Sequence, residues 1–333
     1  MALHNARKFF AASALFLSVA GVSTLAAAES IPPVGTQVPG YFRVAVGDFE
    51  VTALFDGYND LAPSLLLNMD GKNIRTLLSH QAINTPNVQT TFNAFLINTG
   101  KHVVLVDTGA GQCIGATAGD LVDNMRAAGY APEQVDSIFL THMHLDHVCG
   151  LVDGSGKALF PKATVYASAP EVDYWLDETA AAKAPEGARE YFMIAQRSVA
   201  PYKAEGRFKT FVPPESPLPE VHTQLVPGHT PGSTAYSLSS KGQNIMFIGD
   251  MIHNAAVQFD HPEVAIRFDS DPKKAVNIRE SVFAQLAKNG SWVAAAHLPF
   301  PGIGHITSNA KNFHWVPAPY GPYRRPDNVP VLK

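Results

Sequence analysis

Apolar positions along this chain follow two periods, which predict strands and helices in mixed order. Helical spacing of apolar residues predicts helices at 121–128, 169–177, 187–200 and 272–289. Short or alternating apolar runs predict strands at 41–54 (a hairpin turning at Gly47-Asp48), 91–98, 102–106, 135–140, 163–167, 221–226, 234–238, 245–248 and 292–296. The weakly periodic segment 57–90 predicts a surface loop or a short helix. Because the two kinds of element intermix without an internal repeat or a low-complexity linker, a single α/β domain is expected.

The helix at 272–289 has a stop or start signal at each end. Asp271 followed by Pro272 is typical of an N-cap and a first-turn proline. Gly290 after Asn289 is typical of a C-terminal stop. These signals predict the bounds of this helix more sharply than periodicity alone.

Four side chains that can bind a metal ion follow the predicted strand at 135–140. They fall in the hexapeptide His142-Met143-His144-Leu145-Asp146-His147. In an extended segment, His142 and His144 point to the same side. Imidazole and carboxylate ligands suit Zn²⁺ or a similar divalent ion. The hexapeptide therefore predicts a metal site, and the alternative is a polar loop that is rich in histidine by chance.

Three more predicted strands end at a residue of the same kind. These residues are His229 in Gly228-His229-Thr230-Pro231-Gly232-Ser233, Asp250 after Phe247-Ile248-Gly249, and His297 after Ala295-Ala296. Taken singly, each is more typical of a structural residue in a turn. Strand ends on one rim of a sheet converge, so the three can meet the hexapeptide. Seven ligands suit two metal ions with an open position for water.

The N-terminal residues predict a targeting segment. Arg7 and Lys8 precede the uncharged apolar stretch Phe9–Ala20, and Ala26-Ala27-Ala28 supplies small residues for cleavage. This pattern predicts a secretory signal peptide over 1–28, cleaved near Ala28, and a hydrolase domain over 29–333. A membrane anchor is the alternative, although the apolar core is short. The expected location is periplasmic or secreted, without stable membrane insertion.

The net charge and the number of cysteines exclude further classes of protein. Of 25 basic and 29 acidic residues, 23 and 29 remain after cleavage, a formal charge of −6. This charge gives no general attraction to nucleic acid or anionic lipid. Cys113 and Cys149 are too few for a disulfide framework. We expect two small buried apolar side chains, and a single bridge, which export would permit, stays open.

The metal-competent segments together resemble the metallo-β-lactamase superfamily. The resemblance implies an αβ/βα sandwich of two mixed β-sheets flanked by helices, with two divalent metal ions at the edge between the sheets. Zn²⁺ is expected first, with Mn²⁺, Co²⁺ and Fe²⁺ as alternatives. By the same resemblance one metal is held by His142, His144 and His229, the other by Asp146, His147 and His297, and Asp250 bridges both.

Longer stretches are similar to the methyl parathion hydrolase branch, which includes lactone and aryl-ester hydrolases. The similar segments are 40–43, 47–54, 255–260, 269–271 and 297–305. This similarity implies an exported homodimer that acts on a small molecule. True β-lactamases of the superfamily generally lack a bridging aspartate, so Asp250 argues against that activity. The acidic chain argues against nucleic-acid processing, and the short tail after His297 argues against glutathione-thioester hydrolases, which use a C-terminal helical domain.

The expected chemistry is attack of a metal-bridging hydroxide on a carbonyl carbon or a phosphorus. Asp250 would tie the metals together, and Asp146 could also carry the proton to the leaving group. Asp107, at the end of a predicted strand, is a candidate to orient a ligand histidine. Its alternative role is to form the turn before Thr108-Gly109.

The substrate pocket is predicted from the resemblance and from chain position. Trp175 and Phe192 fall at positions that line an aromatic leaving-group pocket, and ordinary core is the alternative for both. A third aromatic position is Ile114 in this chain. The segment after Asp250 adds His253, Ile266 and Phe268, which are expected to face the same cavity.

A pocket with fewer aromatic residues suits lactones and activated aryl esters, with organophosphate triesters as further substrates. The rival enzyme is a dedicated organophosphate hydrolase. The rival of another class is a non-catalytic metal-binding or sensing protein on the same fold.

Overall fold

The computed structural model of the protein describes residues 31–309 and 312–323. The chain divides into two compact units, Met1–Gln37 and Val38–Lys333. In the first unit, residues 31–37 are exposed and have no helix or strand. The predicted signal peptide lies outside the described residues. Within those residues, no helix is both long and apolar enough to span a membrane.

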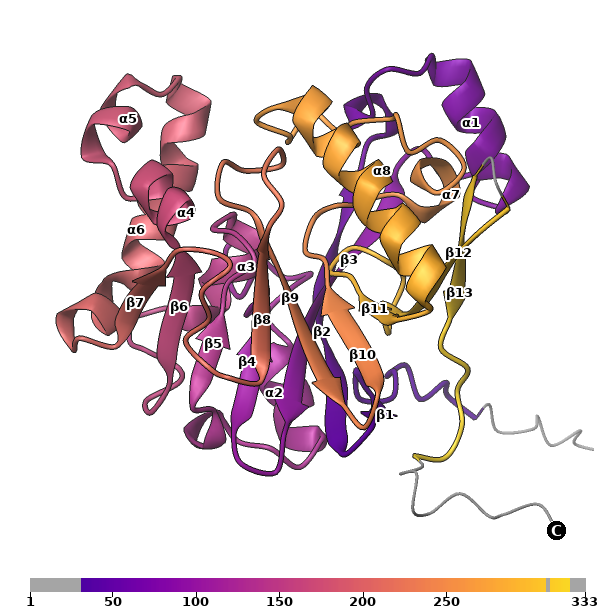
Figure 1. The fold of residues 1–333 in the computed structure, drawn as a ribbon. Coiled ribbons are helices and arrows are strands. Elements are labelled where there is room, and N and C mark those ends of the chain that lie inside the picture. Colours follow the sequence, from indigo (N-terminus) through magenta and orange to yellow (C-terminus); the bar gives the residue numbers. More distant parts are fainter. Residues whose placement is uncertain (1–30, 310–311, 324–333) are drawn as a thin grey trace, which may run out of the picture. The chain divides into compact units, whose positions relative to one another are not determined.

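The first sheet of the second unit has seven strands in sequence order (Figure 1). The strands are β1 (Tyr41–Val46), β2 (Phe49–Leu61), β3 (Val88–Asn98), β4 (Val103–Val106), β5 (Ser137–Phe139), β6 (Thr164–Ser168) and β7 (Phe208–Phe211). The first four pair antiparallel, and the predicted hairpin turns between Val46 and Phe49. The pairs from β4 to β7 are parallel, so the carboxyl ends of these strands lie on one edge of the sheet.

The second sheet has six strands in the order β13-β12-β11-β10-β9-β8. They are β8 (Val221–Leu225), β9 (Thr234–Ser240), β10 (Gln243–Phe247), β11 (Trp292–Ala294), β12 (Ile303–Ser308) and β13 (Phe313–Pro317). β9 is antiparallel to β8 and β10, and β10 is parallel to β11. The strands β8, β10 and β11 therefore run in the same direction and end on one edge.

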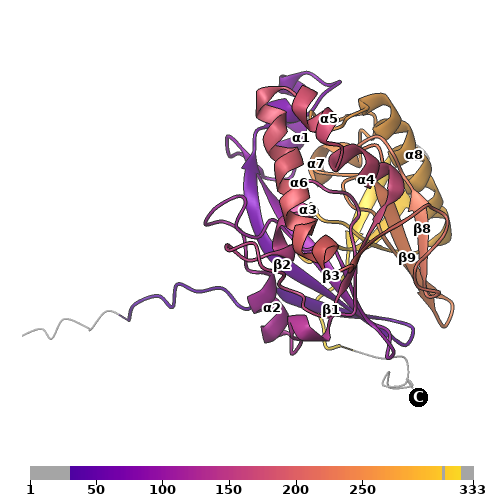
Figure 2. The same ribbon diagram turned by 90° about the vertical axis from the view of Figure 1, so that its left-hand side faces the viewer.

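Helices cover the outer face of each sheet. The α-helices of the described residues are α1 (Gly71–His80), α2 (Leu121–Ala127), α3 (Leu145–Val148), α4 (Ala169–Trp175), α5 (Glu178–Lys183), α6 (Glu186–Ala204), α7 (Ala255–Gln258) and α8 (Pro272–Asn289). Of these, α2, α4 and α6 pack on the first sheet, α8 packs on the second, and α1 and α7 pack on each other. Figure 2 shows α4 to α6 facing the viewer on the side of the first sheet, and α8 lies beyond the second sheet.

A shared core fills the space between the sheets, where Ile97 of the first sheet and Phe247 of the second belong to one buried cluster. The predicted αβ/βα sandwich is confirmed.

The bounds of α8 follow the signals in the sequence. The side chain of Asp271 accepts a hydrogen bond from the backbone N–H of Lys274 at 3.0 Å. At the other end Gly290 adopts a φ of 65°, and its N–H donates to the carbonyl oxygen of Leu286. Val282 and Phe283 are buried on the side of the helix that packs on the second sheet.

Several elements were not predicted. The segment after His297, interpreted as a tail, forms β12 and β13 at the edge of the second sheet. Residues 178–183 and 208–211 form α5 and β7. The weakly periodic segment 57–90 contains the end of β2, which was not predicted, and the short helix α1, which agrees with one of the two forms predicted for this segment. Each of the unpredicted elements is short or has few apolar positions, so its sequence has only a weak periodic signal. Its conformation is determined mainly by packing against the surrounding structure.

The expectation that Cys113 and Cys149 are separate apolar side chains is wrong, because they form a disulfide with a Cα–Cα distance of 6.2 Å. The loop after β4 packs closely against the segment that follows α3. The N–H of Gly150 donates to the carbonyl oxygen of Gly109 at 3.3 Å. A Cβ on Gly150 would lie 1.8 Å from the carbonyl oxygen of Thr108, so only glycine allows this approach.

Candidate metal centre

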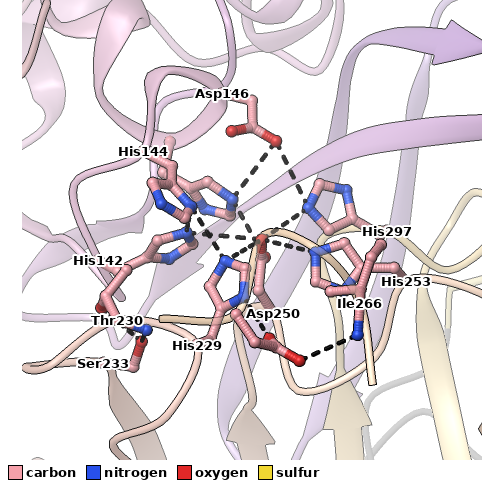
Figure 3. A network of polar contacts seen from close by, with 12 residues as sticks. His142, His144, Asp146, His229, Thr230, Ser233, Asp250, His253, Ile266 and His297 are labelled. Atoms are coloured by element: carbon pink, nitrogen blue, oxygen red, sulfur yellow. Dashed lines mark hydrogen bonds and ion pairs between the residues drawn. The ribbon is translucent and has the colours of Figure 1, made fainter. Parts of the chain in front are cut away.

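All seven predicted metal ligands lie together at the edge between the two sheets. Figure 3 shows them from close by and labels all of them except His147. The hexapeptide follows β5 of the first sheet, whereas His229, Asp250 and His297 follow β8, β10 and β11 of the second. The expectation that the ligands converge on the rim of one sheet is therefore corrected: two sheet edges face each other and each supplies part of the site.

The side chains form two groups that share Asp250. In each group, one ligand atom from every member lies within 4.8 Å of the others: His142, His144, His229 and Asp250 in the first group, and Asp146, His147, Asp250 and His297 in the second. The Asp250 Oδ2 atom lies 3.2 Å from His229 Nε2 and 2.9 Å from His297 Nε2. Its Oδ1 atom lies 3.1 Å from His147 Nε2. The carboxylate thus lies between the two groups, as a bridging ligand must.

A change of backbone conformation lets one hexapeptide serve both groups. His144 is extended, with φ −68° and ψ 157°, and α3 begins at the next residue. The side chains before this point enter the first group, and those of Asp146 and His147 in the helical turn enter the second. A longer strand would send alternate side chains to opposite faces of the sheet.

Close backbone packing positions the loop that carries His229. Gly228 has a φ of 139°, and a Cβ there would lie 2.3 Å from the backbone nitrogen of Ala275 in α8. The N–H of Asp271 donates to the carbonyl oxygen of Gly228 at 2.9 Å. The start of α8 therefore supports the loop directly.

Three ligand histidines are oriented by a hydrogen bond at the ring nitrogen that faces away from the site. His147 Nδ1 donates to Asp107 Oδ2, His229 Nδ1 to Asp269 Oδ1, and His297 Nδ1 to the carbonyl oxygen of Thr91, each at 2.9 Å. The Nε2 atoms are thereby directed inward.

Asp107 fulfils both roles that the sequence left open. It has a φ of 59° in the turn after β4, and it also accepts hydrogen bonds from the N–H and hydroxyl of Thr141 at 2.8 Å. Sequence reasoning missed Asp269 and Thr91. Asp269 stands 40 residues from His229 in the chain, and no local pattern connects the two.

Burial and mutual charge determine the protonation of the site. Burial lowers the pKa of His142 and His144 well below the usual range, and neighbouring histidines lower it further. Burial alone would raise the pKa of Asp250, but His147 and His297 hold it well below the usual range. His142 and His144 are therefore neutral imidazoles with free lone pairs beside an ionised carboxylate. The carboxylate of Asp250 raises the pKa of His147, His229 and His297, so these three rings must release a proton when they bind a metal ion.

The residues fit two divalent metal ions. His147 Nε2 and Asp250 Oδ1 are buried and make no hydrogen bond, although buried polar atoms are nearly always paired. The nitrogen atoms His142 Nε2 and His229 Nε2 each lie 3.0 Å from His144 Nδ1, so three lone pairs of the first group converge. Nitrogen and oxygen donors in this number suit Zn²⁺ and similar ions.

A cavity of about 450 Å³ opens onto this centre. Ligands from both groups line it, and so do four of the predicted pocket residues: Ile114, Trp175, His253 and Phe268. Sequence reasoning missed Phe92, Tyr174, Tyr191 and Arg267, which also line the cavity. Its size is that of a pocket for a small molecule.

Two predicted pocket residues do not line this cavity. Phe192 packs behind Trp175, with ring centroids 4.8 Å apart, because the inner face of α6 turns toward the core. Ile266 is buried in a separate apolar cluster with Leu66 and Ile74. Its backbone N–H donates to Asp269 Oδ2 at 3.0 Å, so it supports the residue that orients His229.

His253 lies deeper than the pocket wall. Its Nε2 atom is 3.2 Å from Asp250 Oδ2, and its ring stacks on His297 with centroids 4.8 Å apart. The side chain is therefore in contact with the candidate metal centre as well as with the cavity.

Fold and site together define a two-sheet sandwich with a candidate binuclear metal centre. The model of the family described as "Metallo-beta-lactamase superfamily" matches residues 92–297. The chain belongs to this superfamily. No curated protein matches its sequence.

Solved structures agree with this assignment. One similar structure is that of the hydrolase AbOPH of the beta lactamase superfamily. It is 44% identical to this chain with a TM-score of 0.83, and the match covers 86% of this chain and 100% of that chain. Another is AidC, a dizinc quorum-quenching lactonase in complex with a product, with 28% identity, a TM-score of 0.79, and coverage of 85% and 99%. A probable metal-dependent hydrolase from Staphylococcus aureus, at 18% identity, 83% and 99% coverage and a TM-score of 0.68, shows the likeness of fold alone.

Proposed function

We propose that this protein is a binuclear metal-dependent hydrolase that opens lactones or cleaves activated aryl esters. The observation that carries the proposal is Asp250, which is shared by two groups of buried ligands and lines the cavity. Two metal ions held by these groups would supply an activated water and polarise the oxygen atom of the substrate.

Asp146 is the residue best placed to move a proton. Its side chain is 17% exposed and lines the cavity, whereas the Asp250 side chain is 3% exposed. Asp146 Oδ2 lies 3.4 Å from His297 Nε2, so the carboxylate faces the centre from the side of the cavity. From this position it can receive a proton released in the attack and pass it to the leaving oxygen.

The wall of the cavity supports a largely apolar substrate. Phe92, Trp175 and Phe268 contribute aromatic surface, and Ile114 contributes an aliphatic side chain. Apolar walls with a few polar groups at one end suit an ester or lactone whose reactive carbonyl points at the metals. The 28% identity to a dizinc lactonase over 99% of that chain supports the same substrate class.

Organophosphate triesters are the second candidate substrates. The indole of Trp175 lies beside the centre, with its ring centroid 5.3 Å from that of His144, and offers a face for an aromatic leaving group. Two metal ions held by these residues would stabilise charge on a phosphoryl oxygen as well as on a carbonyl oxygen.

A substrate panel tests the proposal. The metal content of the purified protein is measured first, and turnover is then compared on dihydrocoumarin, an acyl-homoserine lactone, an aryl ester and methyl parathion. We expect the highest kcat/KM on a lactone or aryl ester. Parathion turnover far above both lactones would reverse this order. Less than one metal per chain, with no hydrolysis after addition of Zn²⁺ or Mn²⁺, would instead favour a non-catalytic binding protein.

We further propose that the protein is exported and that it forms a homodimer. The Cys113–Cys149 disulfide supports an oxidising compartment, because such bridges are rare in reducing ones. N-terminal sequencing of the protein from its native host tests cleavage near Ala28, and light scattering of the mature protein tests the dimer. An uncleaved N-terminus or a monomeric mass would contradict the respective proposal.

A further inference from the structure

A buried carboxylate outside the two ligand groups connects the loops that carry one of them. Glu171 lies in the first turn of α4 and is 1% exposed. Its Oε1 atom accepts a hydrogen bond from the backbone N–H of Met143 at 2.8 Å. Its Oε2 atom accepts from the hydroxyl of Thr230 at 2.6 Å and from the backbone N–H of Gly232 at 2.9 Å.

All three donors belong to loops that carry metal ligands. Met143 lies between His142 and His144, and Thr230 directly follows His229. One carboxylate thus holds both loops that supply the three histidines of the first group. It makes no hydrogen bond to the residues that belong to the second group alone, Asp146, His147 and His297.

The packing around α4 strengthens this connection. A Cβ on Gly232 would lie 2.1 Å from the backbone nitrogen of Glu171, so the start of α4 is in direct contact with the loop that carries His229. The hydroxyl of Ser168 donates to the carbonyl oxygen of Gly232 at 2.6 Å. At the other end of the helix, the ring of Trp175 meets His144 edge to face. Both ends of the helix therefore contact the first group or the loops that carry it.

A contribution to the stability of the fold does not by itself explain why a carboxylate is buried here. Removing a carboxylate from water costs several kcal/mol unless its oxygens are well paired, and apolar residues of similar volume often replace such groups without loss. Here the partners that offset the cost come from the two ligand loops, one of which belongs to the first sheet and the other to the second. The hydrogen bonds of Glu171 therefore fix the position of one ligand loop relative to the other.

We propose that Glu171 is a positioning residue that sets the affinity of the His142–His144–His229 group for its metal ion. The affinity of the group that contains His147 and His297 does not depend on it. The consequence for turnover rests on the proposed hydrolase function, but the consequence for metal affinity does not.

The test compares Glu171→Gln with Asp173→Asn, a matched change at an exposed residue on the same helix. Glutamine keeps the size of the side chain, but one of its two oxygen acceptors becomes a donor. Metal-free protein is titrated with Zn²⁺ against a chelating dye to obtain both binding constants. For Glu171→Gln we expect one constant to weaken by about 10- to 100-fold and the other to keep its wild-type value. Asp173→Asn is expected to keep both.

Anomalous diffraction at the zinc edge identifies the weakened site. In Glu171→Gln crystals at limiting zinc, density is expected beside His297 and missing beside His229. Raising the zinc concentration should restore occupancy and turnover together, a recovery that a merely misfolded variant would not show. Unchanged affinities, or an equal loss at both sites, would overturn the proposal.

A second variant covers the case in which Glu171→Gln fails to fold. Thr230→Val removes one donor to the carboxylate and keeps the shape of the side chain. A smaller loss of zinc affinity, confined to the same site, supports the proposal. An equal loss of zinc affinity at both sites contradicts it. A wild-type protein that binds two ions but hydrolyses no substrate would contradict the proposed function and leave the comparison of affinities valid.

Discussion

Asp250 is the residue on which both ligand groups depend, because its two carboxylate oxygens face different histidines. In Asp250→Asn, one oxygen is replaced by an amide nitrogen that cannot bind a metal ion. We therefore expect the occupancy of both metals to fall together, with at least a tenfold loss of activity.

Metal analysis of the dialysed Asp250→Asn variant checks this expectation, with Asp173→Asn as the matched control. If one metal stayed fully bound and activity persisted, Asp250 would not be a bridging ligand.

Asp56 gives a residue-scale prediction for pH, away from the metal centre. Burial raises its pKa to about 6, although the N–H groups of Ala110, Leu121, Gly119 and Gly111 act in the opposite direction. A pKa above the ordinary value means that the folded protein binds this proton more tightly than the unfolded chain. The stabilisation is thus complete below about pH 4 and is lost as the pH rises through 6.

We expect the free energy of unfolding of metal-free Asp56→Asn to rise relative to wild type by up to about 3 kcal/mol between pH 4 and pH 7. The reason is that asparagine stays neutral while the wild-type carboxyl ionises. Urea unfolding of both proteins at several pH values measures the difference. A difference that is constant with pH would show that the pKa of Asp56 is not raised.

The sequence predicts ligands better than it predicts the residues that support them. His229, Asp250 and His297 could be found because each follows an apolar run that predicts a strand. Asp269 and Glu171 could not, because their function depends on partners 40 and 59 residues away along the chain. Ile266 and Phe192 were predicted to line the cavity, but Ile266 is buried in a separate apolar cluster and Phe192 packs behind Trp175.

At the scale of the element, the spacing of apolar residues was enough to predict the helices and strands that bury one whole face in the core. The strands β4, β9 and β10 and the helix α8 were predicted close to their observed bounds. β12 and β13 were not: β13 is an edge strand that is stabilised by its one neighbour, and β12 has only six residues, of which Ile303 and Ile306 are the large apolar ones. The ligand-bearing helix α3 has four residues, which is too short for any periodic signal.

The start of α8 supplies a prediction for an element. The Asp271 side chain caps the helix, and the Asp271 backbone supports the loop that carries His229. We expect Asp271→Ala to lower the free energy of unfolding by about 1 kcal/mol, because an N–H of the first turn loses its acceptor.

Asp271→Asn keeps an acceptor and is the matched control. Denaturant unfolding of both variants measures the effect. Equal destabilisation in the two would mean that the cap contributes nothing.

At the scale of the whole molecule, metal ions bound at the candidate centre would connect the two sheets. The hexapeptide comes from the first sheet, and the other three ligands come from the second. Bound metal should therefore stabilise the folded protein by about 3 kcal/mol for each ion present at a hundred times its dissociation constant. We expect a chelator to lower the melting temperature and added Zn²⁺ to restore it.

Thermal unfolding with and without chelator measures this effect, and Asp250→Asn should show little of it. A wild-type melting temperature that stays the same after complete metal removal would contradict a link between the sheets.

The division of the ligands between the sheets also has a consequence for the order of events during biosynthesis. When the first sheet has left the ribosome, the hexapeptide is present but neither ligand group is complete, because His229, Asp250 and His297 are still to be made. The last strands of the second sheet follow later still. A complete centre can therefore bind its metal ions only after His297 has been made, and the ions would be chosen from those available where the second sheet folds.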